Sequence, residues 1–115
     1  MASNDFSQLL VSNAVDNAAP ETLLTVPSAP ATCLLRNSRI RFANTTGGAV
    51  TIKVWAIPSG GSAADANVCY PTTSIPANEF KDVDIPKLKA GGFVQAQAGA
   101  ASSITALELD GFVQS

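Results

Sequence analysis

Two stretches near the middle of the chain alternate between apolar and polar residues, and a glycine-containing turn joins them. Residues 39–58 have the sequence RIRFANTTGGAVTIKVWAIP. Side chains of a β-strand point alternately to opposite faces of the sheet, so this period of two predicts two strands. The first predicted face is apolar and holds Ile40, Phe42, Val50, Ile52, Val54 and Ala56. The opposite face holds Arg39, Arg41, Thr51, Lys53, Trp55 and Ile57.

The short glycine-containing turn predicts that these two strands pair as a hairpin. Matching their apolar faces places Phe42 opposite Ile52 and leaves residues 46–48 as a three-residue loop. In loops of this length a glycine commonly adopts a positive φ. The same register sets Arg39 opposite Trp55, which predicts a cation–π contact between them.

The hairpin register also creates an unfavourable pair of like charges. It sets Arg41 opposite Lys53, and like charges directly opposite each other destabilise a sheet unless an acid intervenes. In the later segment KDVDIP, alternation predicts that Asp82 and Asp84 point outward. These two carboxylates are therefore the candidate partners of the arginines.

Short alternating segments recur along the rest of the chain, where eight Gly and seven Pro separate them. The strands that we expect cover residues 6–14, 22–26, 31–44, 49–58, 67–73, 79–85, 93–98 and 104–114. In the last of these, Leu107 and Leu109 are expected to point inward and Phe112 outward. Short strands separated by turn residues predict an all-β fold, here a single antiparallel β-sandwich, jelly-roll-like or Ig-like, of about eight strands.

Length and composition set the domain organisation. A chain of 115 residues is long enough for one hydrophobic core. We expect residues 1–30 to form an extended amino-terminal arm with the first strand or strands, and residues 31–115 to form the sandwich. Charged residues make up only 14% of the chain, against about 25% in typical soluble domains. Such a surface is either merely poor in charge or one that neighbouring proteins cover.

The composition argues against several classes of function. The net charge is -2 and the cations form no stripe, so nucleic acid is not an expected partner. No apolar run approaches the roughly 18 residues of a membrane span, so no membrane partner is expected, and no basic residues precede an apolar core as in a secretory signal. The chain has no His, the commonest general base and metal ligand. We therefore expect no enzymatic activity, catalytic residue, metal or cofactor.

The other candidates for chemistry have simple structural explanations. Cys33 and Cys69 match no zinc or redox spacing. Free thiols are expected in a reducing compartment, with a disulfide as the alternative. Asp65 and Asn67 lie in a glycine-rich segment that lacks the repeated acidic residues of a calcium loop. That segment is expected to be a surface loop.

Association with other proteins is the function that these residues favour. The candidate interface consists of residues expected on outward strand faces: Arg39, Arg41, Lys53, Trp55, Ile57, Phe93 and Phe112. Aromatic residues and arginine are enriched at protein interfaces, although a single Trp equally fits burial within the domain. The alternative is a carbohydrate- or receptor-binding sandwich that uses Trp55 or Tyr70 as a stacking platform.

Residues 40–67, IRFANTTGGAVTIKVWAIPSGGSAADAN, with the turn SIPA at 74–77, resemble a small β-rich module of tailed-bacteriophage structural proteins. The resemblance implies a non-enzymatic virion protein, made in the cytoplasm of the host bacterium. It favours a head decoration or cement protein that binds the major capsid protein from outside as a homo-oligomer, a trimer. The alternative is a neck, tail or fibre-associated module, with tail or neck proteins as partners and an attachment role that includes binding host glycans or receptors.

Overall fold

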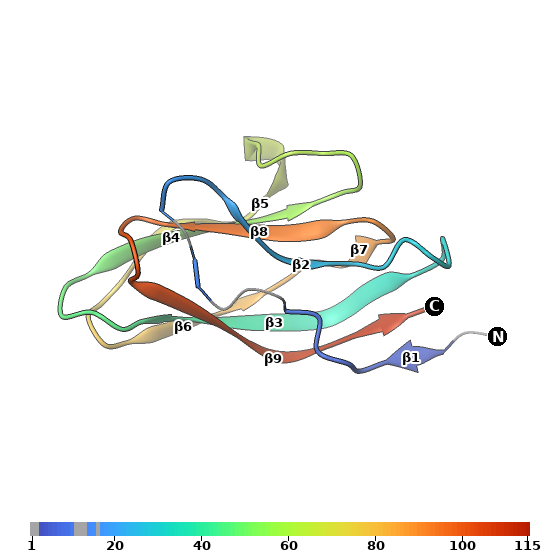
Figure 1. Cartoon of the computed structure of the whole chain (residues 1–115), viewed down its shortest axis with the longest axis horizontal. Coiled ribbons are helices and arrows are strands. Elements are labelled where there is room, and N and C mark those ends of the chain that lie inside the picture. Colours follow the sequence, from blue (N-terminus) through green and yellow to red (C-terminus); the bar gives the residue numbers. More distant parts are fainter. Residues whose placement is uncertain (1–2, 11–13, 16) are drawn as a thin grey trace.

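The computed structural model describes residues 3–10, 14–15 and 17–115. Within these ranges the strands are β1 (Asn4–Asp5), β2 (Glu21–Thr25), β3 (Leu34–Asn44), β4 (Val50–Ile57), β5 (Val68–Ile75), β6 (Phe80–Asp84), β7 (Leu88–Lys89), β8 (Phe93–Ala98) and β9 (Ile104–Gln114), with a 3₁₀ turn, η1 (Asp65–Asn67), before β5. The first sheet has the order β1-β9-β3-β6, with β7 also paired to β3, and the second sheet has the order β2-β8-β4-β5. The sheets stack as a sandwich (Figure 1), which confirms the predicted fold class.

The strands pair in the nested order of a jelly roll. In antiparallel fashion β1 pairs with β9, β2 with β8, β3 with β6, and β4 with β5. Early strands therefore lie beside late ones, and the chain crosses repeatedly from one sheet to the other. Two Greek keys wound in this way make the jelly roll of viral capsid and lectin domains. Of the two sandwich types predicted from the sequence, the structure has the jelly roll.

The predicted hairpin between β3 and β4 is wrong, because these strands belong to opposite sheets. Phe42 lies in register with Ala106 of β9 and not with Ile52. The predicted opposition of Arg39 to Trp55 fails for the same reason. Both inner faces point into one core, so alternation alone does not distinguish a hairpin from two strands that face each other across a sandwich.

A buried side chain, Asn44, guides the chain from the first sheet to the second. Its Nδ2 donates to the carbonyl oxygens of Gly48 at 2.8 Å and Ile75 at 3.0 Å, and its Oδ1 accepts the N–H of Thr46 at 3.0 Å. Asn44 is 2% exposed, and these bonds satisfy its amide inside the protein. Neither Gly48 nor Gly47 has the positive φ that the hairpin loop required.

The hydrophobic core fills the space between the two sheets. Its fully buried members are Leu23, Leu24, Val26, Ile40, Phe42, Ile52, Val54, Ile75, Val94 and Ala96. Most come from central strands, where alternation puts every second residue inside. Alanines on β8 and β9 also belong to the core: Ala96, Ala98 and Ala106 are buried.

The described amino-terminal residues lie beside β9: β1 pairs with its end, and Ala14 forms a bridge with Thr105 (Figure 1). The strand predicted over 6–14 does not form over 6–10, and residues 11–13 lie outside the described residues. Asp5 explains why β1 is short: its Oδ1 accepts the N–H of Ser7 at 2.9 Å. This Asx-type turn takes the chain out of the ladder.

A break in register interrupts the pairing of β3 with β9 between Arg36 and Arg39. Here Asn37 has a φ of 54° and Gly111 a φ of 133°. A Cβ added to Gly111 would lie 3.0 Å from the Cα of Ser38. The two strands therefore approach each other too closely for a side chain at position 111.

Replacing Gly111 with Ala is expected to lower the free energy of unfolding by about 1–3 kcal/mol, because positive φ and the contact with Ser38 both oppose a side chain. Urea denaturation of the two proteins measures this difference. Gly47→Ala is the matched control, since nothing lies within 4 Å of an added Cβ there. Equal losses in the two variants would contradict the predicted strain.

Candidate interface

The seven candidate interface residues lie on two opposite surfaces of the sandwich rather than on one. The first sheet carries three of them on its outer side: Arg39, Arg41 and Phe112. The second sheet carries the other four on its outer side: Lys53, Trp55, Ile57 and Phe93. One flat partner surface therefore cannot contact the whole set.

On the outer side of the second sheet, the protein's own segment 58–67 lies over part of β4. Trp55 is 5% exposed and Ile57 is 0% exposed, although neither belongs to the core cluster between the sheets. The turn η1 contacts β4, and an added Cβ on Gly61 would lie 3.0 Å from Ile57 Cγ2. Figure 1 shows this segment lying over the second sheet. Alternation predicts the outward direction of these side chains but not their burial.

Lys53 links Trp55 on β4 to Asp65 in segment 58–67. Its Nζ lies 5.3 Å from the centroid of the Trp55 ring and 4.0 Å from Oδ1 of Asp65 in η1. Both distances are within reach of a weak electrostatic contact. The cation beside Trp55 therefore comes from the same strand and not, as predicted, from Arg39.

The outer side of the first sheet exposes apolar side chains. Among the described residues, the exposed large hydrophobics are Phe6 (69%), Leu107 (52%), Phe80 (50%) and Leu109 (38%). Leu107 lies in register with Arg41 on this side, and Phe80 lies beside Arg41. The Phe6 ring packs against Phe112 with centroids 5.0 Å apart. Apolar side chains gathered on one side are typical of contact sites, whereas scattered ones are not.

We call the central part of this side the outer patch. Its members come from β3, β6 and β9 and are Arg39, Arg41, Phe80, Asp82, Asp84, Leu107 and Leu109. The sequence-based prediction that Leu107 and Leu109 point inward is wrong. A register shift beside Arg39 changes which residues of β9 face the core, so that Ala106 and Val113 both do.

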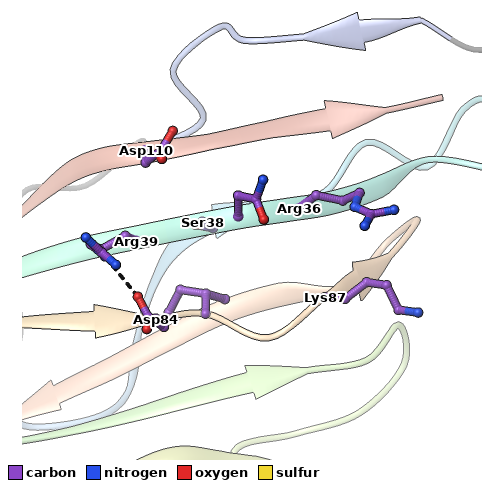
Figure 2. Close-up of a pocket in the computed structure, with 8 residues that line it drawn as sticks. Arg36, Ser38, Arg39, Asp84, Lys87 and Asp110 are labelled. Carbon is purple, nitrogen blue, oxygen red and sulfur yellow. Dashed lines mark hydrogen bonds and ion pairs between the residues drawn. The ribbon is translucent and has the colours of Figure 1, made fainter.

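Two ion pairs cross from β3 to β6 within the outer patch. Arg41 donates to Asp82 through Nε at 2.8 Å and Nη2 at 3.2 Å, and its guanidinium lies 3.8 Å from the centroid of the Phe80 ring. Arg39 donates to Asp84 through Nε at 2.9 Å (Figure 2). The prediction that these two carboxylates pair with the arginines is confirmed.

The ion pairs shift the pKa values of Asp82 and of the two arginines toward their charged forms. The hydrogen bond from Arg41 holds the pKa of Asp82 below its ordinary value. Hydrogen bonds to Asp82 and Asp84 raise the pKa of Arg41 and of Arg39. Because the charges largely compensate, the patch is close to neutral yet holds two arginines in fixed orientations. This combination suits contact with a protein better than contact with a phosphate backbone.

Glu108 and the two cysteines are partly or fully buried away from the outer patch. Glu108 accepts the N–H of Leu9 at 3.2 Å, and its partial burial raises its pKa. Cys33 and Cys69 are free thiols, as predicted, and burial raises the pKa of Cys69 to about 11. The described part of the chain contains no group of three or more potential metal-ligating side chains. No helix within the same ranges is long and apolar enough to cross a bilayer.

Comparison with known proteins identifies the fold. No family model and no curated protein matches the sequence. The structure is similar to a chain of the T13 infectious bursal disease virus particle, with a TM-score of 0.53 and 9% identity over 99% of this chain and 30% of that chain. It is likewise similar to a chain of the Gx strain of that virus, with a TM-score of 0.53 and 12% identity over 99% of this chain and 32% of the other. The fold resembles a viral capsid protein domain.

Proposed function

We propose that this protein is a non-enzymatic structural component of a virus particle, and specifically a decoration or cement protein on the outside of a tailed-phage head. The observation that carries the proposal is a capsid-type jelly roll whose first sheet leaves the outer patch uncovered. The resemblance of residues 40–67 to phage structural proteins supports the same role. A neck, tail or fibre-associated module with an attachment role is the second candidate, because the resemblance is shared among virion positions.

Two of the edge strands, β5 and β6, support contact through a sheet face rather than by strand addition. The edge strand β5 contains Pro71 and two register shifts in its pairing with β4. The edge strand β6 carries Lys81, Asp82 and Asp84 and is followed by Pro86. Proline, charge and irregular pairing are the features that keep an edge from adding another strand.

In this role the outer patch binds the major capsid protein. Half-exposed Leu107 and Phe80 supply apolar area, and burial of such area stabilises a complex by about 25 cal/mol per Å². The pair of Arg41 with Asp82 is already formed, so binding does not have to order these side chains. The protein assembles as a homo-oligomer, a trimer, in keeping with the closed symmetry of most oligomers.

The decisive variant is Leu107→Asp, tested on capsid shells of the encoding phage assembled without this protein. The wild type is expected to co-sediment with the shells and to raise the temperature at which they break. An aspartate at the centre of an interface costs at least about 2 kcal/mol, or roughly 30-fold in affinity. The free energy of unfolding should stay nearly unchanged, because Leu107 is 52% exposed.

Thr72→Asp is the matched control, since it adds the same charge at an exposed position of β5 in the second sheet. This variant should bind shells like the wild type. Absence of wild-type binding to shells contradicts the decoration role, and binding to purified tails or necks instead supports the second candidate. Sedimentation equilibrium of the isolated protein tests the trimer.

A further inference from the structure

A polar hollow of about 480 Å³ opens beside the outer patch (Figure 2). It forms where the first sheet is interrupted. On one side β6 ends at Asp84 and β7 begins only at Leu88, and Pro86 between them has no N–H for the ladder. On the other side Asn37, with its φ of 54°, bends β3 away from regular pairing. The hollow is therefore built by the backbone and does not depend on one side-chain conformation.

Three cations line this hollow: Arg36, Arg39 and Lys87. Arg36 donates through Nη1 to the amide oxygen of Gln114 at 3.3 Å, a long bond to a neutral group. Lys87 has no hydrogen bond or ion pair with any described residue. We call the part of the hollow beside Arg36 and Lys87 its cationic end (Figure 2).

The carboxylates of the hollow do not neutralise the cationic end. Asp84 accepts a hydrogen bond from Arg39 at 2.9 Å, and Asp110 accepts the N–H of Gly111 at 2.8 Å. Figure 2 shows both acids away from the cationic end, near Arg39. Among the residues that line the hollow, the two remaining cations thus have no acid of their own.

Arg39 has guanidinium N–H groups in the same hollow that do not bond to Asp84. It uses Nε alone for Asp84, whereas Arg41 binds Asp82 with both Nε and Nη2. Ser38 also lines the hollow, is 3% exposed, and has a hydroxyl without a hydrogen-bond partner among the described residues. Buried polar groups are normally paired, so an unpaired hydroxyl here is unusual.

We propose that the cationic end of this hollow binds a carboxylate carried by an acidic side chain of a partner protein. A guanidinium and an ammonium that line the same hollow both donate hydrogen bonds that suit a carboxylate, and such charge-assisted bonds are stronger than neutral ones. Asp84 and Asp110 at the other end repel the dense charge of a nucleic-acid backbone. The inference rests on the proposed function only because it takes the partner to be a protein. Binding of the carboxylate is measured on this chain alone, without capsid shells.

The test is an NMR titration with a blocked acidic pentapeptide, Ac-Gly-Glu-Gly-Glu-Gly-NH2. The backbone amides of residues 36–38 and of Lys87 are expected to shift and to saturate with a Kd of about 1 mM, the affinity of a single small contact. The peptide with Gln in place of Glu should shift none of them. The double variant Arg36→Ala, Lys87→Ala should weaken binding at least about tenfold, whereas Lys81→Ala, outside the hollow, should not.

Several outcomes overturn this assignment. They are an equal response to the Gln peptide, unchanged affinity of the double variant, or tighter binding of inorganic phosphate than of the acidic peptide. Leu107→Asp should still bind the peptide, because Leu107 does not line the hollow. If Leu107→Asp loses shell binding but still binds the peptide, the outer patch and the hollow act separately. Each of the two proposals is then tested on its own.

Discussion

Phe42→Ala is expected to lower the free energy of unfolding by about 3–5 kcal/mol, because truncation of a buried aromatic side chain leaves a cavity. Phe42 is fully buried in the central strand β3, in register with Lys81 of β6 and Ala106 of β9. Domains of this kind have a total stability of about 5–15 kcal/mol, so the variant loses a large share of it. Urea unfolding followed by circular dichroism gives the difference directly.

Two controls separate cavity formation from loss of an aromatic ring. Phe42→Leu keeps most of the buried volume and should cost less than about 1.5 kcal/mol. Phe6→Ala removes the same atoms from a side chain that is 69% exposed and contacts the ring of Phe112. It should cost no more than about 1 kcal/mol, the scale of one aromatic contact. Similar losses at positions 6 and 42 would contradict the central place of Phe42.

Strand positions could be predicted from the sequence because alternation is a local property. The strand expected over 104–114 matches β9, and those expected over 22–26 and 93–98 match β2 and β8 within one residue. Partner choice is not local. The hairpin expectation failed because β3 pairs with β9 and β4 with β8, strands far along the chain. Where β3 ends, the Asn44 amide likewise bonds to the carbonyl of the distant residue Ile75. No pattern near Asn44 indicates that contact.

The orientation of β9 shows a second limit of pattern analysis. A strand with one continuous period has one inner face, so Val113 inside implied Leu107 and Leu109 inside. The register shift opposite Arg39 moves the inward positions by one, and Ala106 faces the core instead. The only signals of this shift in the sequence are the adjacent Asp110 and Gly111, and neither identifies a bulge on its own. The apolar part of the outer patch was missed for this reason.

The outer side chains of the two sheets differ in exposure, and alternation in the sequence does not predict this difference. Segment 58–67 is rich in Gly, Ser and Ala, which predicts a surface loop but not that it lies on β4. Alternation correctly placed Trp55 and Ile57 on the outer side, yet both are buried there. Arg39 and Arg41, on the other sheet, keep their access to a partner. Trp55 and Ile57, two of the predicted interface residues, are therefore not exposed.

Trp55→Ala is expected to lower the free energy of unfolding by about 3–5 kcal/mol, because the indole is buried and its truncation leaves a cavity. Trp55 is the only tryptophan of the chain and is 5% exposed, so its fluorescence reports directly on the burial of the indole. In the native protein its emission should resemble that of a buried indole, resist quenching by iodide, and move to longer wavelength on unfolding. The measurements are the emission spectrum, iodide quenching and urea unfolding of wild type and variant.

Thr51→Ala, at an exposed position of the same strand, is the control and should cost less than about 1 kcal/mol. Segment 58–67 is tied to β4 through Ile57 and through Lys53 with Asp65. Loss of Trp55 should therefore loosen the segment, and amide hydrogen exchange over 58–67 should become faster in Trp55→Ala than in Thr51→Ala. A native Trp55 that iodide quenches freely, together with an unchanged free energy of unfolding in Trp55→Ala, would show that the loop leaves the indole open to a partner. In that case Trp55 returns to the candidate interface, and the second sheet offers a contact surface of its own.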